Sequence, residues 1–269
     1  MMSSHMALPR EGHLAQLFHI FSYLKKYHNT EMVFDLSDPV IDELEFVLQD
    51  WTSSKFRHIQ GKEELLPNVP QPCCLGFVIQ AKVDADHASD TVTQQSRTNF
   101  MVYLNCALIY WLGKKQTSVE SFSFGSEFIA MKQYCEYIHG LWYKLRMMGI
   151  LVQGPTYIYG DNKSVLANTM IPNSTLKKKS QSNMYHFVHE GATKNKWRTM
   201  YVNMNDNESD LLTKIFPSGK KHQGFVHYCY IISLHPVVDH TCISRITWFF
   251  VCMDVSMELN HEMFLFVWM

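Results

Sequence analysis

The pattern of apolar and polar positions predicts an amphipathic helix near the start of the chain. From His13 to Tyr27, apolar residues recur at helical spacing, and two lysines fall in the last turn, where positive charge complements the helix dipole. A strand-like segment, EMVFD, follows over 31–35. Because one side of this helix is an apolar stripe, the helix needs a partner surface.

An irregular linker is predicted after this first helix. From Asp35 to Pro72 the periodicity weakens, acidic residues cluster, and prolines interrupt the chain, which is typical of a connection without regular structure. Strand patterns begin directly afterwards. We therefore expect a domain boundary near Cys74.

The central part of the chain alternates between strand and helix patterns. Apolar residues at every second position over 77–83 predict a strand, and two more strand patterns are separated by only two residues, which predicts an antiparallel hairpin. In chain order, the predicted elements are strands over 77–83, 99–104 and 107–112, a helix over 126–148, a strand over 156–160, helices near 163–169 and through His189, a strand over 197–203 and a helix over 206–215. This order predicts a mixed sheet covered by helices.

Composition narrows the class of protein without identifying it. The chain has 269 residues, of which 46% are hydrophobic, so it can fill a core and disorder is not expected. The 24 basic and 25 acidic residues nearly cancel, so any binding of nucleic acid would depend on a local basic patch. The seven cysteines are odd in number and form no CxxC pair, which favours reduced thiols and an intracellular location.

Neither end of the chain carries a pattern for secretion or membrane insertion. The first residues contain no apolar core of signal-peptide length, so secretion is not expected. The apolar region 225–269 is interrupted by histidines and charged residues before any run reaches about 18 residues. We therefore expect no membrane partner.

Four acidic residues fall where the predicted sheet would gather them. Asp84 ends the first strand of the central segment, and Asp161 follows the fourth. If these strands are parallel neighbours, both carboxylates emerge at the edge where α/β sheets usually place ligands. Glu127, at the opening of the long helix, and Asp210, in the last helix, would approach from covering helices. Clustered carboxylates repel one another, so the pattern indicates an oxygen-ligand site for Mg²⁺ or Mn²⁺.

Each of these acidic residues taken alone has an ordinary structural explanation. Asp161 is typical of a turn or helix cap, Glu127 in a first helical turn complements the helix dipole, and Asp210 fits a solvated helix surface. Their joint order and spacing favour the metal site. Asp86 lies where a polar loop begins, and we expect it to face solvent or to lie outside the set of ligands.

Five motifs follow one another through the central part of the chain: VDADHASD, SRTNFMVYLNCALIYWLGKKQ, FGSEFIAMKQ, YGDNKSVLAN and NESDLLTK. In this order they resemble the ribonuclease H domain of copia-type LTR retrotransposon Pol polyproteins. The upstream segment HLAQLFHIFSYLKKYHNTEMVFD is similar to the C-terminal part of the reverse transcriptase that precedes this nuclease. The expected divisions are a reverse-transcriptase remnant over 1–40, a linker over 41–75, a ribonuclease H-like domain over 76–216 and an atypical apolar tail over 217–269.

The resemblance implies a ribonuclease H-like α/β fold with a mixed five-stranded sheet, three strands antiparallel plus two parallel, flanked by helices. It implies hydrolysis of the RNA strand of RNA/DNA hybrids with two divalent ions, Mg²⁺ or alternatively Mn²⁺. Asp84 would bridge both ions, Glu127 and Asp161 would hold one of them, and Asp210 would hold the ion that bears the nucleophile. The expected protein partner is a polymerase domain supplied in trans, in a cytoplasmic virus-like particle or in the nucleus.

Two clusters of mainly basic residues are candidates for contacts to the backbone of a hybrid. The candidates are Arg97, Lys114, Lys115, Gln116, Lys177, Lys178 and Lys179. A charge run is usually only a solvated surface, but recognition of A-form shape and 2′ hydroxyls requires such backbone contacts. Two alternatives stay open: an inactive retroelement fragment that at most binds nucleic acid, and an integrase or resolvase of the same general fold.

Overall fold

The computed structural model describes residues 10–26, 34–42, 46, 49–52, 67–72, 76–90, 92–174, 182–204 and 206–213. The chain divides into two compact units, one formed by Met1–Val33 with Gly219–Met269 and the other by Phe34–Ser218. The described part of the first unit is helix α1 (Glu11–Lys26), which confirms the predicted helix. The predicted apolar tail over 217–269 lies outside the described residues, as does most of the strand predicted over 31–35.

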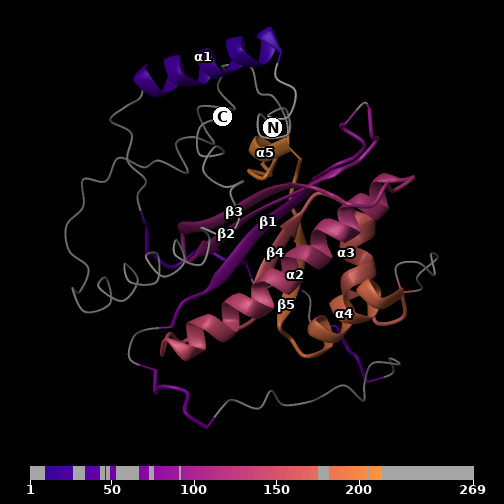
Figure 1. The fold of residues 1–269 in the computed structure, drawn as a ribbon. Helices are drawn as coiled ribbons and strands as arrows, with labels where there is room; N and C mark the ends of the chain where they lie inside the picture. The colour runs from indigo at the N-terminus through magenta and orange to yellow at the C-terminus, as the bar shows by residue number, and fades with distance from the viewer. Residues whose placement is uncertain are drawn as a thin grey trace. The chain divides into compact units, whose positions relative to one another are not determined.

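The second unit is built on one five-stranded mixed sheet. Its strands are β1 (Ile79–Asp86), β2 (Arg97–Leu104), β3 (Ala107–Lys115), β4 (Thr156–Gly160) and β5 (Trp197–Tyr201). They lie in the order β3-β2-β1-β4-β5 (Figure 1). Strand β2 is antiparallel to both β1 and β3, whereas β4 is parallel to both β1 and β5. This confirms the predicted sheet of three antiparallel strands extended by two parallel ones.

The hairpin between β2 and β3 turns at Asn105, whose backbone φ is 55°. Asparagine adopts this left-handed conformation more readily than most residues, so it suits a tight turn. Both polar atoms of its side chain are also hydrogen-bonded. Oδ1 accepts from the backbone N–H of Val78 at 2.8 Å, and Nδ2 donates to the carbonyl of Leu36 at 2.9 Å. The turn therefore ties the upstream segment 34–42 to the start of β1.

The described residues of the second unit also form four helices. They are α2 (Ser123–Met147), α3 (Lys163–Met170), α4 (Ser182–Thr193) and α5 (Asp210–Thr213). Helix α2 packs along β1 and β2 and crosses the sheet in Figure 1, α3 and α4 pack on β5, and α5 contacts β1, β2 and β3. None of the helices in the described part of the chain combines the length and apolar character that a membrane crossing needs.

Side-chain alternation along β1 gives the sheet two different faces. Ile79, Ala81 and Val83 are buried on the face that α2 covers. Lys82 and Asp84 point to the opposite face, because neighbouring residues of a strand alternate sides. Strand β1 thus contributes apolar side chains to the core on one face and presents polar side chains on the other.

Two helices of the second unit begin at residues other than those predicted. Helix α2 begins at Ser123, so the prediction that Glu127 lies in its first turn is wrong. The N-cap residue, Phe122, makes no capping bond with its side chain, and hence the usual sequence signal for a helix start is absent. Helix α5 begins at Asp210, four residues later than predicted, because the side chain of Asn207 accepts bonds from the backbone and hydroxyl of Ser209 and holds a turn.

Helix α4 is fixed against the sheet by Trp197, which is 1% exposed. The indole Nε1 donates to the carbonyl of Val188 at 3.0 Å. A Cβ atom added at Gly191 would lie 1.8 Å from the indole ring, so the close approach of α4 to β5 requires glycine at this position.

Candidate metal centre

Three carboxylates from distant parts of the sequence meet at the carboxyl ends of two neighbouring strands. Asp84 lies near the end of β1, Asp161 follows β4 directly, and Glu127 comes from α2. One ligand oxygen from each lies within 4.8 Å of the other two. The parallel pairing of Val83 with Gly160 is what places Asp84 and Asp161 side by side, as the sequence pattern predicted.

Glu127 reaches this site because the start of α2 is tied to the sheet and its edge. Gln116 is 2% exposed, and its side-chain amide donates to the hydroxyl of Thr98 at 3.0 Å and to the carbonyl of Ser126 at 2.9 Å. The hydroxyl of Ser126 lies 3.2 Å from Nδ1 of His87, in the loop after β1. The suggestion that Gln116 contacts phosphate is therefore wrong, since its amide anchors the helix that carries Glu127.

Asp210 is completely buried at the start of α5 and is not a member of the close group of three described carboxylates. The preceding turn lies on the side of the sheet to which Lys82 and Asp84 point, because Glu208 in that turn binds the ammonium of Lys82. The side-chain amide of Asn207 donates to the carbonyl of Val83 at 3.3 Å. The structure thus gathers three of the four predicted ligands and holds the fourth at the start of α5.

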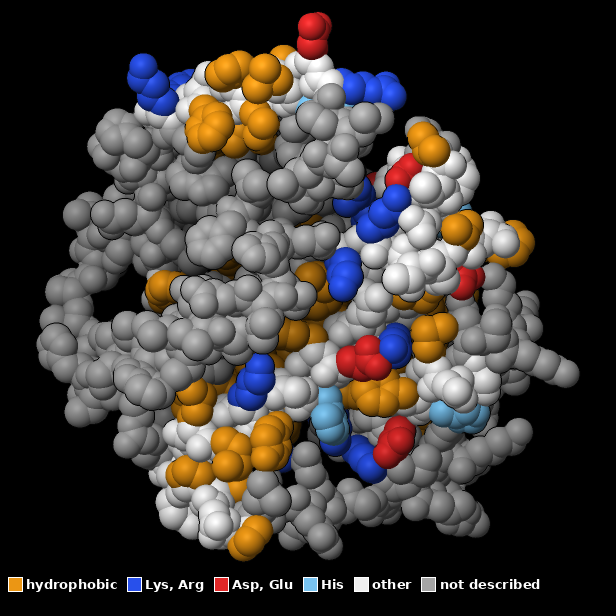
Figure 2. All heavy atoms as spheres, in the orientation of Figure 1, with side chains coloured by type: hydrophobic (Ala, Val, Ile, Leu, Met, Phe, Trp, Pro, Cys, Tyr) orange, Lys and Arg blue, Asp and Glu red, His pale blue; other side chains and the backbone are white. Residues whose placement is uncertain are grey.

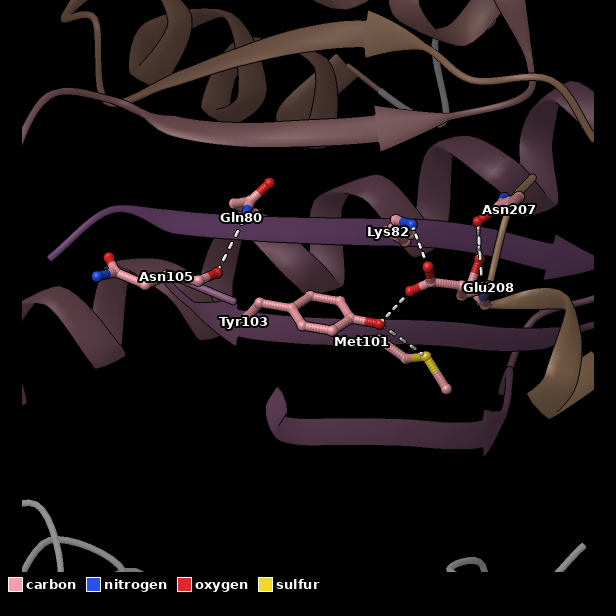
Figure 3. Close-up of polar contacts among 8 residues, drawn as sticks. Gln80, Lys82, Met101, Tyr103, Asn105, Asn207 and Glu208 are labelled. Carbon is pink, nitrogen blue, oxygen red and sulfur yellow. Dashed lines mark hydrogen bonds and ion pairs between the residues drawn. The ribbon is translucent and has the colours of Figure 1, made fainter. Parts of the chain in front are cut away.

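The turn before Asp210 is held by a buried carboxylate with two partners (Figure 3). Oε1 of Glu208 lies 2.6 Å from the ammonium of Lys82, and Oε2 accepts a hydrogen bond from the hydroxyl of Tyr103 at 2.5 Å. The Glu208 side chain is 8% exposed, so both bonds are largely shielded from water. We call Lys82, Tyr103 and Glu208 the brace; nothing in the local sequence pattern indicated it.

Asn99 is a second buried residue that the sequence pattern did not indicate. It lies directly opposite Asp84 in the β1–β2 pair and is 0% exposed. Neither Oδ1 nor Nδ2 of its side chain has a hydrogen-bond partner among the described residues. The signal that the sequence offered was the residue type, because asparagine is uncommon within a strand.

The first basic cluster lies at one end of the hairpin formed by β2 and β3. Arg97 pairs with Lys115 across these strands and with Asp86 on β1, which places the three side chains on the face that carries Asp84. Lys114 is exposed, whereas the ammonium of Lys115 binds Asp90 at 2.5 Å. That ion pair holds the pKa of the Asp90 carboxyl well below its usual range. The ammonium of Lys115 is thus already paired with Asp90, whereas the side chain of Lys114 is more accessible to an anion.

Lys177, Lys178 and Lys179, the second predicted cluster, lie outside the described residues. On the described part of the face drawn in Figure 2, basic and acidic side chains are interspersed, in agreement with the near-neutral net charge. On this face, a contact to a nucleic-acid backbone would therefore depend on individual lysines and arginines and not on a broad positive surface.

Comparison with curated proteins finds similarity to Pol polyproteins of plant transposons. The chain is 29% identical over 136 residues to the retrovirus-related Pol polyprotein from transposon RE2 of Arabidopsis thaliana, covering 51% of this chain and 9% of that protein. It is 25% identical over 154 residues to the corresponding polyprotein from transposon TNT 1-94 of Nicotiana tabacum, covering 55% and 11%. The chain therefore matches about a tenth of the length of these relatives, which confirm the predicted resemblance to a retrotransposon Pol polyprotein.

No protein-family model matches the chain. Among solved structures, RNase H1 from the halophilic archaeon Halobacterium salinarum NRC-1 is similar with a TM-score of 0.38 and 13% identity, over 50% of this chain and 92% of that one. LC11-RNase H1 in complex with an RNA/DNA hybrid is similar with a TM-score of 0.36 and 8% identity, over 49% and 88%.

Proposed function

We propose that residues 76–216 are the ribonuclease H domain of a copia-type retrotransposon Pol polyprotein, which hydrolyses the RNA strand of RNA/DNA hybrids with divalent metal ions. The observation that carries this proposal is the meeting of Asp84, Glu127 and Asp161 within 4.8 Å at the ends of parallel strands. The similarity to transposon Pol polyproteins supports it, because reverse transcription produces such hybrids. Mg²⁺ is the proposed ion, with Mn²⁺ as a substitute.

The donor set fits this kind of ion. All three groups offer carboxylate oxygens, which Mg²⁺ and Mn²⁺ prefer over nitrogen or sulfur ligands. Oxygens bound to one Mg²⁺ lie about 2.1 Å from it, and so at most about 4.2 Å from each other. Since the three oxygens lie within 4.8 Å, small side-chain rotations bring them into range. Bound divalent ions would activate water and stabilise the leaving oxygen.

We assign the residues distinct tasks. Asp84, the most buried of the three, would bridge two ions, while Glu127 and Asp161 would hold one ion and orient the scissile phosphate. Asp210, at the start of α5, would hold the second ion. Arg97, Lys114 and Lys115 would contact the hybrid backbone, together with Lys177 and Lys178, and a polymerase domain supplied in trans would be the protein partner.

The experiment that tests this proposal offers the purified chain a labelled RNA/DNA hybrid with Mg²⁺ and with EDTA. Single-stranded RNA and duplex DNA of the same sequence serve as matched substrates. We expect Mg²⁺-dependent cleavage of the RNA strand of the hybrid and no cleavage of the other substrates, with hybrid binding that weakens as salt rises. Hybrid binding without cleavage at any Mg²⁺ or Mn²⁺ concentration would favour the alternative, an inactive retroelement fragment.

A further inference from the structure

We infer that Asn99 is an additional oxygen ligand of the cation that Asp84 holds. The inference rests on the proposed metal site and extends it to a residue on the neighbouring strand. Asn99 and Asp84 are direct partners in the antiparallel β1–β2 pair, so their side chains leave the sheet on the same face. Cβ atoms of such partners lie about 4.5–5.5 Å apart, which leaves room for one small ion or water between the two polar ends.

The described residues offer no hydrogen-bond partner that explains the burial of the Asn99 side chain. The residue is 0% exposed, and neither polar atom of its side chain has a partner among the described residues. Its neighbour on the other side is Gly113 of β3, which offers no side chain. Buried polar groups are almost always hydrogen-bonded. Because Asn99 lies directly opposite Asp84, a ligand held between these two side chains would satisfy its amide.

Asn105 shows how the same fold treats an asparagine with a structural task. It is also buried, at 4% exposed, but its amide accepts from Val78 and donates to Leu36 and Asp38. Both residues belong to the β2–β3 hairpin and have the same side chain. The difference is that both polar atoms of Asn105 have partners, whereas those of Asn99 have none in the part of the chain that the structure describes, and Asn99 is the one opposite Asp84.

A divalent cation is the ligand that best matches this position. The surrounding ligands, Asp84, Glu127 and Asp161, already bring three acidic groups together. An amide oxygen is a hard, neutral donor, so it completes the coordination of Mg²⁺ or Mn²⁺ without adding a further negative charge. The amide Nδ2 remains free to donate to a metal-bound water or to a carboxylate.

The test measures Mn²⁺ binding and thermal stability on the purified full chain, with no nucleic acid present. Asn99→Leu has a similar shape and no polar atoms. We expect it to lower Mn²⁺ affinity about tenfold and to leave the melting temperature without metal unchanged or higher, because an unsatisfied polar group has been removed. Asn105→Ala is the matched control, expected to lower the melting temperature and to leave Mn²⁺ affinity unchanged.

Two further variants keep the result interpretable. Asn99→Asp retains an oxygen donor, so Mn²⁺ affinity should equal or exceed that of the wild type, which also covers the case in which Asn99→Leu does not fold. Unchanged affinity in Asn99→Leu, or weakened affinity in Asn99→Asp, would overturn the inference. If the wild type binds no Mn²⁺, or Asp84→Asn binds it equally well, the proposed metal site itself is wrong, which is a separate failure.

Discussion

The two faces of the sheet differ in the kind of side chain that strand β1 presents on them. On the face covered by α2, β1 presents Ile79, Ala81 and Val83, which contribute apolar surface to the core. On the other face, β1 presents Lys82 and Asp84, which require specific partners from other segments. The apolar side chains of β1 therefore stabilise the fold by burial, whereas its polar side chains depend on individual bonds and include Asp84 of the proposed metal site.

The largest effect is expected from a substitution on the polar face that leaves the core residues unchanged. We expect Asp84→Asn to lower the rate of Mg²⁺-dependent hybrid cleavage by about a thousandfold or more, since a charge that holds the ions is lost. The fold should persist, because removing a charge from a carboxylate cluster relieves repulsion. Single-turnover cleavage and a circular dichroism melt measure the two effects. Cleavage at the wild-type rate would refute the placement of the ligands.

The converse change acts on the covered face. Ile138 of α2 is 1% exposed. Ile138→Ala should lower the free energy of unfolding by about 3 kcal/mol through lost burial and the cavity left behind. Mn²⁺ affinity of the folded protein should not change. Urea denaturation followed by fluorescence measures the loss, and a value below about 1 kcal/mol would show that this helix contributes little to the core.

The brace tests whether the polar face also contributes stability through particular bonds. Glu208→Ala leaves Lys82 and Tyr103 without their shared carboxylate. Since Lys82 is 23% exposed, water screens part of the penalty, and we expect a loss of about 1–2 kcal/mol in unfolding free energy. In a double-mutant cycle with Lys82→Met, the second change should cost less than it does in the wild type. Strict additivity of the two changes would mean that the ion pair does not hold the turn.

The smallest expected effect is a loss of unfolding free energy at low pH through His189. His189 of α4 is buried and donates through Nε2 to the carbonyl of Asn168. Burial lowers the pKa of its imidazole to about 4, and nearby His186 acts in the same direction. The unfolded chain takes up a proton near pH 6.5, so this contribution to stability is complete above pH 6.5 and is lost as the pH falls toward 4. We expect a loss on the order of 1–2 kcal/mol between pH 7 and pH 5. His189→Gln should flatten the difference in unfolding free energy between pH 7 and pH 5, and an unchanged slope would exclude His189 as its source.

Periodicity along the chain was sufficient to predict the sheet and most of the helices. Apolar alternation marked β1 directly, and the carboxyl ends of β1 and β4 then implied that Asp84 and Asp161 meet. These predictions succeeded because strand direction and alternation are local properties whose geometric consequences are fixed.

What the sequence did not show depends on contacts between distant segments. Gln116 follows two lysines and has the pattern of a surface residue, yet the start of α2 buries it. Lys82 and Glu208 lie far apart in the sequence, and no local pattern pairs them. Asn99 is unusual only once its burial and its position opposite Asp84 are known. The missed residues are polar groups whose partners come from elsewhere in the fold.

The central claim is that Asp84, Glu127 and Asp161 form one divalent-cation site. The most direct measurement is anomalous diffraction at the manganese edge from crystals soaked in Mn²⁺. The account predicts a peak within coordination distance of all three carboxylates. A fully soaked crystal with no peak among these side chains, or with its strongest peak elsewhere, would contradict it.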